Sequence, residues 1–452
     1  MNPTAMESDR EAVAELQQRL HEDERAYGRL FASIAFKRAL VKLLGREGAL
    51  APATAGLCVP DAQLIRRRTV VPMLEFARRS PQFRELWRGG APFVVAPPRV
   101  IGVGDQHAQR GVRRSGWVAR IDDVVVRGRS AVLLASDGSA LVDVEGDEDR
   151  QFEDNPEFDP AVLAVDGRHF WTIEAGDDVA VLEEAFMLGG TYAHDFGHWI
   201  TEHLARLTIA LRAGMPKVPL LIDQRMPATH LQALRLFVPD FEVIQLPHLA
   251  ARRVRRLWVA PNPLYRGFSP TCWSDAWHAM MPEPADFAGA IADLKQRAAY
   301  ALAEPTGVDR LFLARRPHRK KRLVNHAAIE KIAAARGYRI VYPEEFDFAT
   351  QIRLVHNARR IVAPDGSAGL LSYFARPGTS VCFLNNPHTL PLVELGGIFA
   401  CLGVEYSVLT GPIHGVPQPE PFWNDYEIDP AVFESYLSAI DGEQDEAVVT
   451  AC

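Results

Sequence analysis

The sequence predicts an α/β protein built around a parallel sheet, and three observations lead to this prediction. The chain has 452 residues, which is too long for one ordinary core and favours two or three domains. Apolar residues make up 48% of it and charged residues 24%, a balance typical of globular proteins. Over residues 309–385, short apolar runs alternate with helix-like segments. This alternation is typical of parallel strands joined by helices on both faces of the sheet.

The first 185 residues differ from the rest in composition and in the pattern of their apolar residues. Residues 6–45 are rich in Ala, Glu, Arg and Leu at helical spacing, so we expect a helical N-terminal segment over residues 1–90 without chemistry. Residues 91–185 hold short Val- and Ile-rich runs broken by Gly, Asp and Pro, which predict a small β-rich module. Its expected strands include residues 124–126, 131–135 and 161–165.

After Gly190 the chain alternates between strand-like and helix-like segments. We assign residues 186–300 to a first domain and residues 301–440 to a second, separated by a Pro-rich stretch at 261–284 that predicts a loop or an interdomain crossing. The expected strands are 220–222, 243–244, 257–259, 311–314, 338–342, 360–363 and 380–384. The expected helices follow Asn325, Asp347 and Gly366, and the first and third end at Gly337 and Gly378.

Charge and cysteine content restrict the function and the compartment. A formal net charge of −7 argues against a nucleic-acid binder that works through overall basicity. The basic runs at residues 66–68, 252–256 and 315–322 fit solvated faces. The five cysteines form no CxxC spacing and indicate reduced core thiols. With no leader-like or membrane-spanning pattern, we expect a cytoplasmic protein. Run 66–68 and the N-terminal segment are the features able to make weak peripheral contact with the inner membrane face.

The first candidate site is a glycine-rich turn at residues 189–190 that opens a helix. Helical spacing places His198, Glu202 and Arg206 on one face, apart from the apolar face of Ile200 and Leu204. One interpretation is a solvated face with a Glu202–Arg206 ion pair. A second is a carboxylate beside a histidine that removes a proton from a sugar hydroxyl. A third is zinc bound by the cluster from His194 to His203, although its spacing does not match HExxH.

Two further motifs follow predicted strands of the second domain. Residues 361–371 run from a strand through a tight turn into a helix, where backbone N–H groups can hold a phosphate or diphosphate. The residues of that turn are Asp365, Gly366, Ser367 and Ala368. A basic run directly after residues 311–314 offers guanidinium groups that can neutralise a departing diphosphate, and a solubilising loop is the alternative. Its candidates are Arg315, Arg316 and Arg322.

In this order, the motifs resemble the family 61 glycosyltransferases, the bacterial capsular polysaccharide biosynthesis type. The first signature corresponds to residues 195–202 from Asp195 to Glu202, with Arg206 following. The second corresponds to residues 313–316 and 322–325, and the third to residues 363–369 with Pro377-Gly378. The resemblance covers roughly residues 185–385. The chain departs from the family at Asp195, His326, Asp365 and Asn385.

The resemblance implies two Rossmann-like domains of the GT-B type, inversion at the anomeric carbon and no obligatory metal or other cofactor. It implies a nucleotide-sugar donor, and an oligosaccharide or lipid-linked glycan as acceptor. On this interpretation Glu202 is the base, with His198 as its orienting partner or the alternative base, and Asp195 completes the catalytic motif. Arg315, Arg316, Arg322 and residues 365–368 bind the donor. The departures leave open a non-catalytic binding or scaffold protein, and the histidine cluster leaves open a metal-dependent hydrolase.

Overall fold

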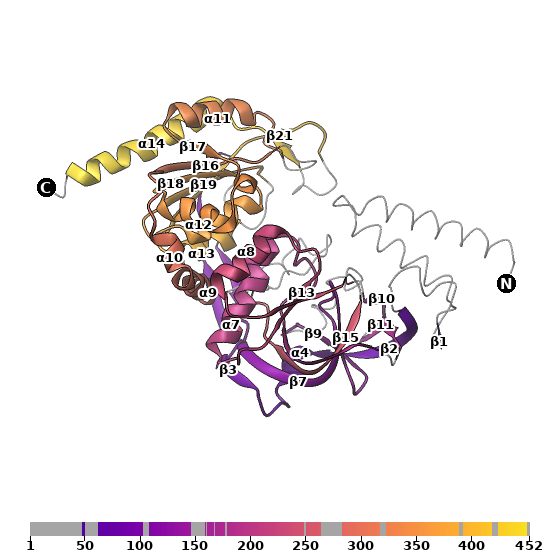
Figure 1. The fold of residues 1–452 in the computed structure, drawn as a ribbon. Helices are drawn as coiled ribbons and strands as arrows, with labels where there is room; N and C mark the ends of the chain where they lie inside the picture. Colours follow the sequence, from indigo (N-terminus) through magenta and orange to yellow (C-terminus); the bar gives the residue numbers. More distant parts are fainter. Residues whose placement is uncertain are drawn as a thin grey trace. The chain divides into compact units, whose positions relative to one another are not determined.

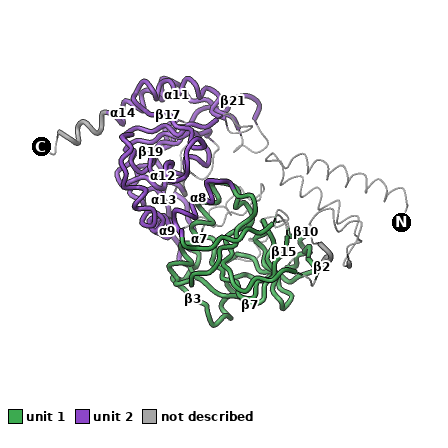
Figure 2. The backbone as a smooth tube through the Cα atoms, in the orientation of Figure 1, with its two compact units in different colours: residues 1–90, 114–226, 240–280 green, residues 91–113, 227–239, 281–452 purple. Residues whose placement is uncertain are grey.

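The computed structural model describes residues 48–49, 62–102, 108–145, 159, 161–166, 168–176, 179–247, 250–263, 283–316, 322–387, 392–417 and 424–449. The helix expected over 6–45, most of the Pro-rich stretch and residues 317–321 of the third basic run lie outside these ranges. The chain divides into two compact units (Figure 2). Unit 1 comprises Met1–Gly90, Arg114–Met226 and Asp240–Met280, and unit 2 comprises Ala91–Arg113, Pro227–Pro239 and Met281–Cys452.

Unit 1 is built on one mixed sheet that changes character along its width (Figure 1). At one end its strands are mostly antiparallel, in the order β10 (Val162–Asp166), β11 (His169–Ala175), β2 (Ala62–Pro72), β9 (Ser139–Val142), β8 (Leu133–Ala135) and β7 (Gly116–Arg127). The other end is parallel, in the order β15 (Ala251–Val259), β12 (Val181–Met187), β13 (Leu220–Asp223) and β14 (Val243–Leu246). β1 (Gly48–Ala49) and β3 (Arg84–Trp87) pair at the margins.

The two ends join through β7 and β15, which pair antiparallel from Ala119 to Arg127. The strands expected in the β-rich module therefore share one sheet with the parallel strands that follow it. The change in sequence texture near Gly190 coincides with the change from antiparallel to parallel pairing. The strands expected at 220–222, 243–244 and 257–259 are confirmed, and the last extends back to Ala251. Apolar residues of β7 and β15, among them Ile121 and Leu257, are buried in one core with helix α4 (Met73–Ala77).

The helix expected after the glycine-rich turn is present but is not a uniform α-helix. It consists of a short turn α6 (Phe196–His198), a π-helical segment η3 (Trp199–Leu204) and α7 (Ala205–Arg212). Every residue of η3 is buried. The π-helical turn shifts the side chains away from the regular 3.6-residue spacing on which the predicted faces depended. Of the interpretations of this motif, the solvated face is wrong at Glu202, because the whole of η3 is buried.

Unit 2 contains a sheet whose strands all run parallel. Their order is β17 (Arg339–Val341), β16 (Arg310–Leu313), β18 (Arg360–Pro364), β19 (Ser380–Asn385), β20 (Glu405–Thr410) and β5 (Arg99–Ile101). The four strands expected here from sequence are confirmed. All five residues of β18 are buried, as expected for a central strand covered on both faces. The edge strand β5 comes from a segment 200 residues or more away in sequence and was not expected here.

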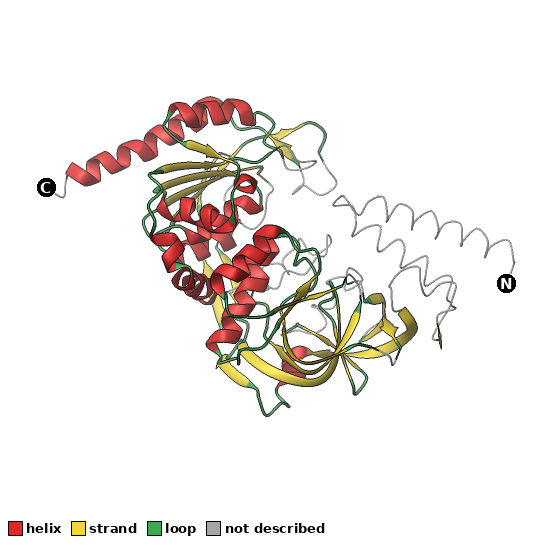
Figure 3. Ribbon diagram, in the orientation of Figure 1, coloured by secondary structure: helices red, strands yellow, loops and turns green. Residues whose placement is uncertain are grey.

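Helices cover both faces of this sheet, as the alternation predicted (Figure 3). On one face Phe312, Val362 and Cys382 pack with α11 (His326–Ala335) and α14 (Pro430–Val449). Neighbouring residues of a strand point to opposite faces, so Phe383 lies on the other face, against Phe399. The helical elements associated with that second face are α8 (Ala228–Phe237), α9 (Pro284–Arg297), α10 (Ala299–Ala303), α12 (Phe348–Asn357), η6 (Ser367–Phe374) and α13 (Leu392–Cys401).

Two details differ from the sequence-based expectations. Asn325 occupies the N-cap position of α11, but its side chain does not cap the helix and instead donates to the carbonyl of Ile428. Among the cysteines in the described ranges, Cys382 is a buried core thiol, as expected, whereas Cys401 is exposed. The expectation of a core thiol is therefore wrong for Cys401, because it is the last residue of α13 and lies on that helix's outer side.

Candidate functional site

Each unit has a topological switch point, where successive parallel strands are added on opposite sides of a central strand. In unit 1 the centre is β12, with β13 on one side and β15 on the other. In unit 2 the centre is β16, with β17 on one side and β18 on the other. Ligands of open α/β sheets bind outside the carboxyl ends of the strands at such points. The residues that follow β12, β15, β16 and β18 are therefore the structural candidates.

The switch point of unit 1 brings together a histidine, a glutamate and an asparagine. His198 Nδ1 lies 2.5 Å from Glu202 Oε1, and Asn262 Nδ2 donates to Glu202 Oε2 at 2.8 Å. His198 and Glu202 belong to the helix that follows β12, and Asn262 follows β15. Two of the three predicted catalytic residues, His198 and Glu202, are thus in direct contact. Asn262 was not predicted as a site residue, although it is a polar residue that closely follows a predicted parallel strand.

Glu202 is a buried carboxylate whose environment keeps it charged. Burial raises its pKa, but the charge of His198 and the hydrogen bonds from His198 and Asn262 outweigh burial, so the pKa lies below its ordinary value. An ionised carboxylate accepts, so the Nδ1–H of His198 donates to it whether the ring is charged or neutral. In the neutral ring the lone pair lies on Nε2. The side chain of His198 is 18% exposed against 8% for Glu202. The histidine is therefore the more accessible member of the pair.

The turn before the helix explains why glycines stand at 189–190. The carboxylate of Asp223, at the end of β13, accepts from the N–H of Gly190 at 3.0 Å and from that of Arg129 at 2.5 Å. A Cβ at Gly189 would lie 3.0 Å from the backbone nitrogen of Asp223, a tight contact that favours glycine, and Gly190 has a φ of 134°, which L side chains rarely adopt. Tyr192 has a φ of 62° and its ring stacks on His198 with centroids 4.9 Å apart. A residue held in this sparsely populated backbone region supports the histidine ring.

The other predicted members of this motif have different surroundings. Asp195 caps α6 by accepting from the N–H of Gly197 at 2.9 Å. His194 Nε2 contacts the carbonyl of Gln224, and the buried His203 donates from Nδ1 to that of Leu188. Burial, followed by the charge of Arg206, lowers the pKa of His203 to about 4, so the ring is neutral at pH 7.

The predicted Glu202–Arg206 ion pair is replaced by other partners. Arg206 pairs with Asp143 at 3.6 Å, while Glu202 bonds to His198 and Asn262. Within the described ranges, no group of three His, Cys, Asp or Glu side chains is arranged to hold a metal ion. The three histidines of the cluster contact three different partners, which gives no support to the metal-dependent hydrolase.

In unit 2 the switch point brings Arg315 against the turn after β18. Arg315 Nη1 donates to the carbonyl of Asp365 at 2.7 Å. Gly366 has a φ of 150°, and a Cβ there would lie 3.2 Å from Arg315 Nη1. Ser367 and Ala368 begin the helical segment η6, whose N-terminal end therefore lies beside this guanidinium. The predicted donor residues 365–368 and Arg315 thus form one cluster.

The other two predicted donor arginines have carboxylate partners. Arg316 pairs with Glu344 and Glu345 and lies over the Tyr342 ring, 4.6 Å from its centroid. Arg322 makes three hydrogen bonds to Asp425, at 2.8, 3.0 and 2.6 Å, which raise the arginine's pKa and lower that of the carboxyl. The structure therefore brings only Arg315 of the three into contact with the turn.

A two-residue strand, β22 (Asp425–Tyr426), organises this region and had no signal in the sequence. Asp425 holds Arg322, and the buried Tyr426 hydroxyl donates to the carbonyl of Leu384 at 2.7 Å. The same hydroxyl accepts from the N–H of Asp365 at 3.1 Å. Tyr426 thereby ties the carboxyl ends of β18 and β19 together. It lies 61 residues from Asp365 in sequence, so only folding brings the two together.

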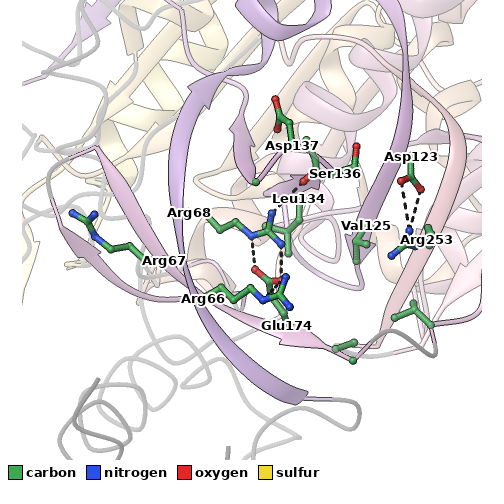
Figure 4. Close-up of a pocket in the computed structure, with 15 residues that line it drawn as sticks. Arg66, Arg67, Arg68, Asp123, Val125, Leu134, Ser136, Asp137, Glu174 and Arg253 are labelled. Carbon is green, nitrogen blue, oxygen red and sulfur yellow. Dashed lines mark hydrogen bonds and ion pairs between the residues drawn. The ribbon is translucent and has the colours of Figure 1, made fainter. Parts of the chain in front are cut away.

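A cavity of about 420 Å³ lies in unit 1 among strands β2, β7, β8, β11 and β15 (Figure 4). Arg68 on its wall makes a bidentate pair with the buried Glu174 at 2.5 and 2.6 Å, and Arg253 pairs with Asp123 at 3.4 Å. Each of these ion pairs joins two different strands, so we assign these charged residues a role in holding the strands together. Of the 66–68 run, Arg66 is 54% exposed but Arg68 only 12%. The expectation of a solvated face is therefore wrong for Arg68, because Glu174 holds it in the interior.

The basic run on β15 is partly neutralised in the same way. Arg255 pairs with Glu183 at 3.0 Å and Arg256 with Glu184 at 3.4 Å, both on the neighbouring strand β12. Their side chains are substantially exposed, in agreement with the predicted solvated face. Searched over its described residues, the structure contains no helix with the length and apolar character needed to cross a bilayer.

Part of the chain matches the model of a known protein family. Residues 196–382, less than half of the chain, match the family model described as Glycosyltransferase 61. The matched segment includes His198, Glu202 and Asn262 in unit 1 and Arg315 and the Asp365–Gly366 turn in unit 2. No curated protein matches the chain. The family match identifies the chain as a glycosyltransferase enzyme.

Proposed function

We propose that this glycosyltransferase transfers a sugar from a nucleotide-sugar donor to an oligosaccharide or lipid-linked glycan, with inversion at the anomeric carbon. The proposal rests on the side chains found at the two switch points. One holds a histidine–carboxylate pair suited to proton removal, and the other holds an arginine beside a glycine turn and a helix N-terminus. These are the two functions that an inverting transfer needs.

In this reaction an acceptor hydroxyl oxygen attacks the anomeric carbon of the donor sugar. A carbon–oxygen bond to the acceptor forms while the bond to the diphosphate breaks, and the bonding electrons leave with the nucleoside diphosphate. His198 takes the hydroxyl proton on Nε2, and Glu202 stabilises the resulting imidazolium through Nδ1–H. We assign the base to His198 because it is the more accessible of the pair and both Glu202 oxygens are already hydrogen-bonded.

Unit 2 would bind the donor. The Arg315 guanidinium and the backbone N–H groups at the start of η6 are suited to the charge that develops on the diphosphate. In this proposal the Asp365 carboxylate does not contact phosphate, and its main-chain carbonyl orients Arg315. Arg322 has a smaller role, since Asp425 already compensates its charge. A GT-B arrangement, capsular or exopolysaccharide synthesis and a metal-independent reaction extend the proposal, as does a cytoplasmic location at the inner membrane face.

A panel of nucleotide sugars, followed by release of nucleoside diphosphate in the presence of glycan acceptors, tests the proposal. We expect His198→Gln to reduce kcat by about 10²–10⁴-fold, as is typical for loss of a positioned base, while nucleoside diphosphate binding is retained. Glu202→Gln should also lose most of its activity. His194→Gln serves as the control, because this histidine lies in the same motif but contacts the carbonyl of Gln224 instead of Glu202. Wild-type turnover by His198→Gln would exclude it as the base.

The alternative is a non-catalytic binding protein. The engagement of Arg316 and Arg322 by carboxylates favours this alternative, because fewer guanidinium groups remain to stabilise a leaving group. Nucleoside diphosphate binding by the wild-type protein without turnover of any sugar nucleotide in the panel would support it.

A further inference from the structure

Behind Glu202, a network of buried polar groups fixes the backbone of Asn262. The Asn262 N–H donates to Asp143 Oδ2 at 2.6 Å, and the Asn262 carbonyl accepts from Arg114 Nη1 at 2.6 Å. Arg114 also donates from Nη2 to Asp143 Oδ1 at 2.9 Å. Asn262 is thus held on both sides by a single arginine–aspartate pair, and its side chain is buried.

A fixed backbone leaves the Asn262 amide directed at Glu202. Its Nδ2 reaches Oε2 at 2.8 Å, so Oε1 is the oxygen that meets His198. An amide satisfies a buried carboxylate without adding charge. An arginine or lysine at this position would compete with His198 for the carboxylate, whereas an aspartate would repel it.

We infer that Asn262, together with the Arg114–Asp143 pair, is the positioning residue of the His198–Glu202 pair and fixes the rotation of the Glu202 carboxylate. The inference rests on the proposed function, because it assigns Asn262 a role in that reaction. In this assignment Asn262 is a positioning residue that acts through its hydrogen bond to Glu202. The assignment also explains why Arg206 pairs with Asp143 instead of Glu202: Arg206 belongs to the supporting network.

Loss of the amide has a defined electrostatic consequence. The titratable groups that act on Glu202 are His198 and the neutral His203 on its own helix and Arg206 one turn further on. From the neighbouring elements, Asp143 and Arg114 act on Arg206. The Asn262 hydrogen bond favours the ionised carboxylate, so its removal raises the pKa of Glu202. Because His198 must be neutral to act as the base, the acidic limb of the pH–rate profile reports protonation of the His198–Glu202 pair. Without the amide, the carboxylate relies more strongly on His198, which favours the imidazolium and moves the limb to a higher pH.

The first test compares pH–rate profiles of Asn262→Ala and Asn262→Asp with wild type. We expect kcat to fall about tenfold in Asn262→Ala and the acidic limb to move up by about one pH unit, as for a lost hydrogen bond to a charged group. Asn262→Asp keeps the volume but opposes two carboxylates, so its limb should move further. Thr172→Val is the matched control, since it removes a buried hydroxyl donor from another buried carboxylate of unit 1, Glu174. Its limb should stay in place.

A second measurement separates failure of this inference from failure of the proposed function. Histidine side-chain NMR of ¹⁵N-labelled protein, with the His198 signal identified by its loss in His198→Gln, follows its titration without any substrate. Asn262→Ala should alter the His198 titration and Thr172→Val should not. An unchanged titration and an unchanged acidic limb would overturn the positioning role even if transfer is observed. A changed titration in a protein that transfers no sugar would retain the role and reject the reaction.

Discussion

At Glu202, a charge is kept in the interior by hydrogen bonds to both of its oxygens. Burying an ionised carboxylate without partners costs several kcal/mol, so an isolated glutamate at this position would be protonated or would destabilise the fold. The His198 ring and the Asn262 amide compensate that cost, and their removal one at a time leaves the other oxygen's bond in place. Because both groups bond to the same carboxylate, the effects of replacing them should be coupled.

His203 gives the fold a defined pH dependence. Its pKa is about 4 in the folded protein against an ordinary 6.5, so between these values the unfolded chain binds a proton that the folded chain does not. Stability is complete above pH 6.5 and is lost as pH falls towards 4, by about 3 kcal/mol in total. Chemical denaturation from pH 7 to 4.5 should show a shallower loss in His203→Asn, whose amide can still donate to Leu188. Equal slopes for the two proteins would contradict this.

Gly366 and Arg315 should be coupled in donor binding. In Gly366→Ala the new Cβ lies 3.2 Å from Arg315 Nη1, so the guanidinium must move and nucleoside diphosphate affinity should fall about tenfold. Gly378→Ala is the control, because Gly378 also has a positive φ, of 78°, but its Cβ meets nothing within 4 Å. Arg315→Ala should weaken binding by about 1.5–3 kcal/mol and Arg322→Ala by less. Calorimetric titration with UDP, GDP, ADP and CDP measures these affinities, and equal losses at Gly366 and Gly378 would remove the coupling.

At the scale of elements, the strands could be predicted and the site geometry only in part. Apolar runs such as 360–363 identify buried parallel strands directly, because these strands lack polar faces. The contact of His198 with Glu202 followed from their spacing of four residues. The burial of Glu202 did not follow from that spacing, because residues distant in sequence, such as Asn262, cover this part of the helix. Asn262 and Tyr426 reach the sites through long-range packing, which local sequence does not encode.

The Tyr426 hydroxyl of β22 should stabilise the turn at residues 365–368. Tyr426→Phe removes the bonds to Leu384 and Asp365, and we expect weaker nucleoside diphosphate binding and faster amide exchange at residues 365–369. Tyr436→Phe is a matched loss of a buried phenol in the same unit, because its hydroxyl bonds to Ser407 on β20. Both variants should lose similar stability, about 1 kcal/mol each. Faster exchange at 365–369 in Tyr436→Phe as well would show a general loosening of the unit.

At the scale of the whole molecule, the two switch points belong to different units. A nucleoside diphosphate should therefore protect unit 2 more strongly than unit 1. Hydrogen–deuterium exchange with the nucleotide that binds should show the largest protection at residues 310–316 and 360–374, and less at 196–212. Protection centred on 196–212 would instead place the nucleotide beside His198 and reverse the roles proposed for the two units.

The units also exchange segments along the chain, and this restricts how the protein can have evolved. Residues 91–113 give unit 2 its edge strand β5, and residues 227–239 give it α8, although both stretches are flanked by unit 1. A gene fragment beginning at residue 281 would encode a sheet without that edge strand and an aromatic core without Phe237. A single recombination crossover would therefore not transfer unit 2 into another gene as an intact cassette.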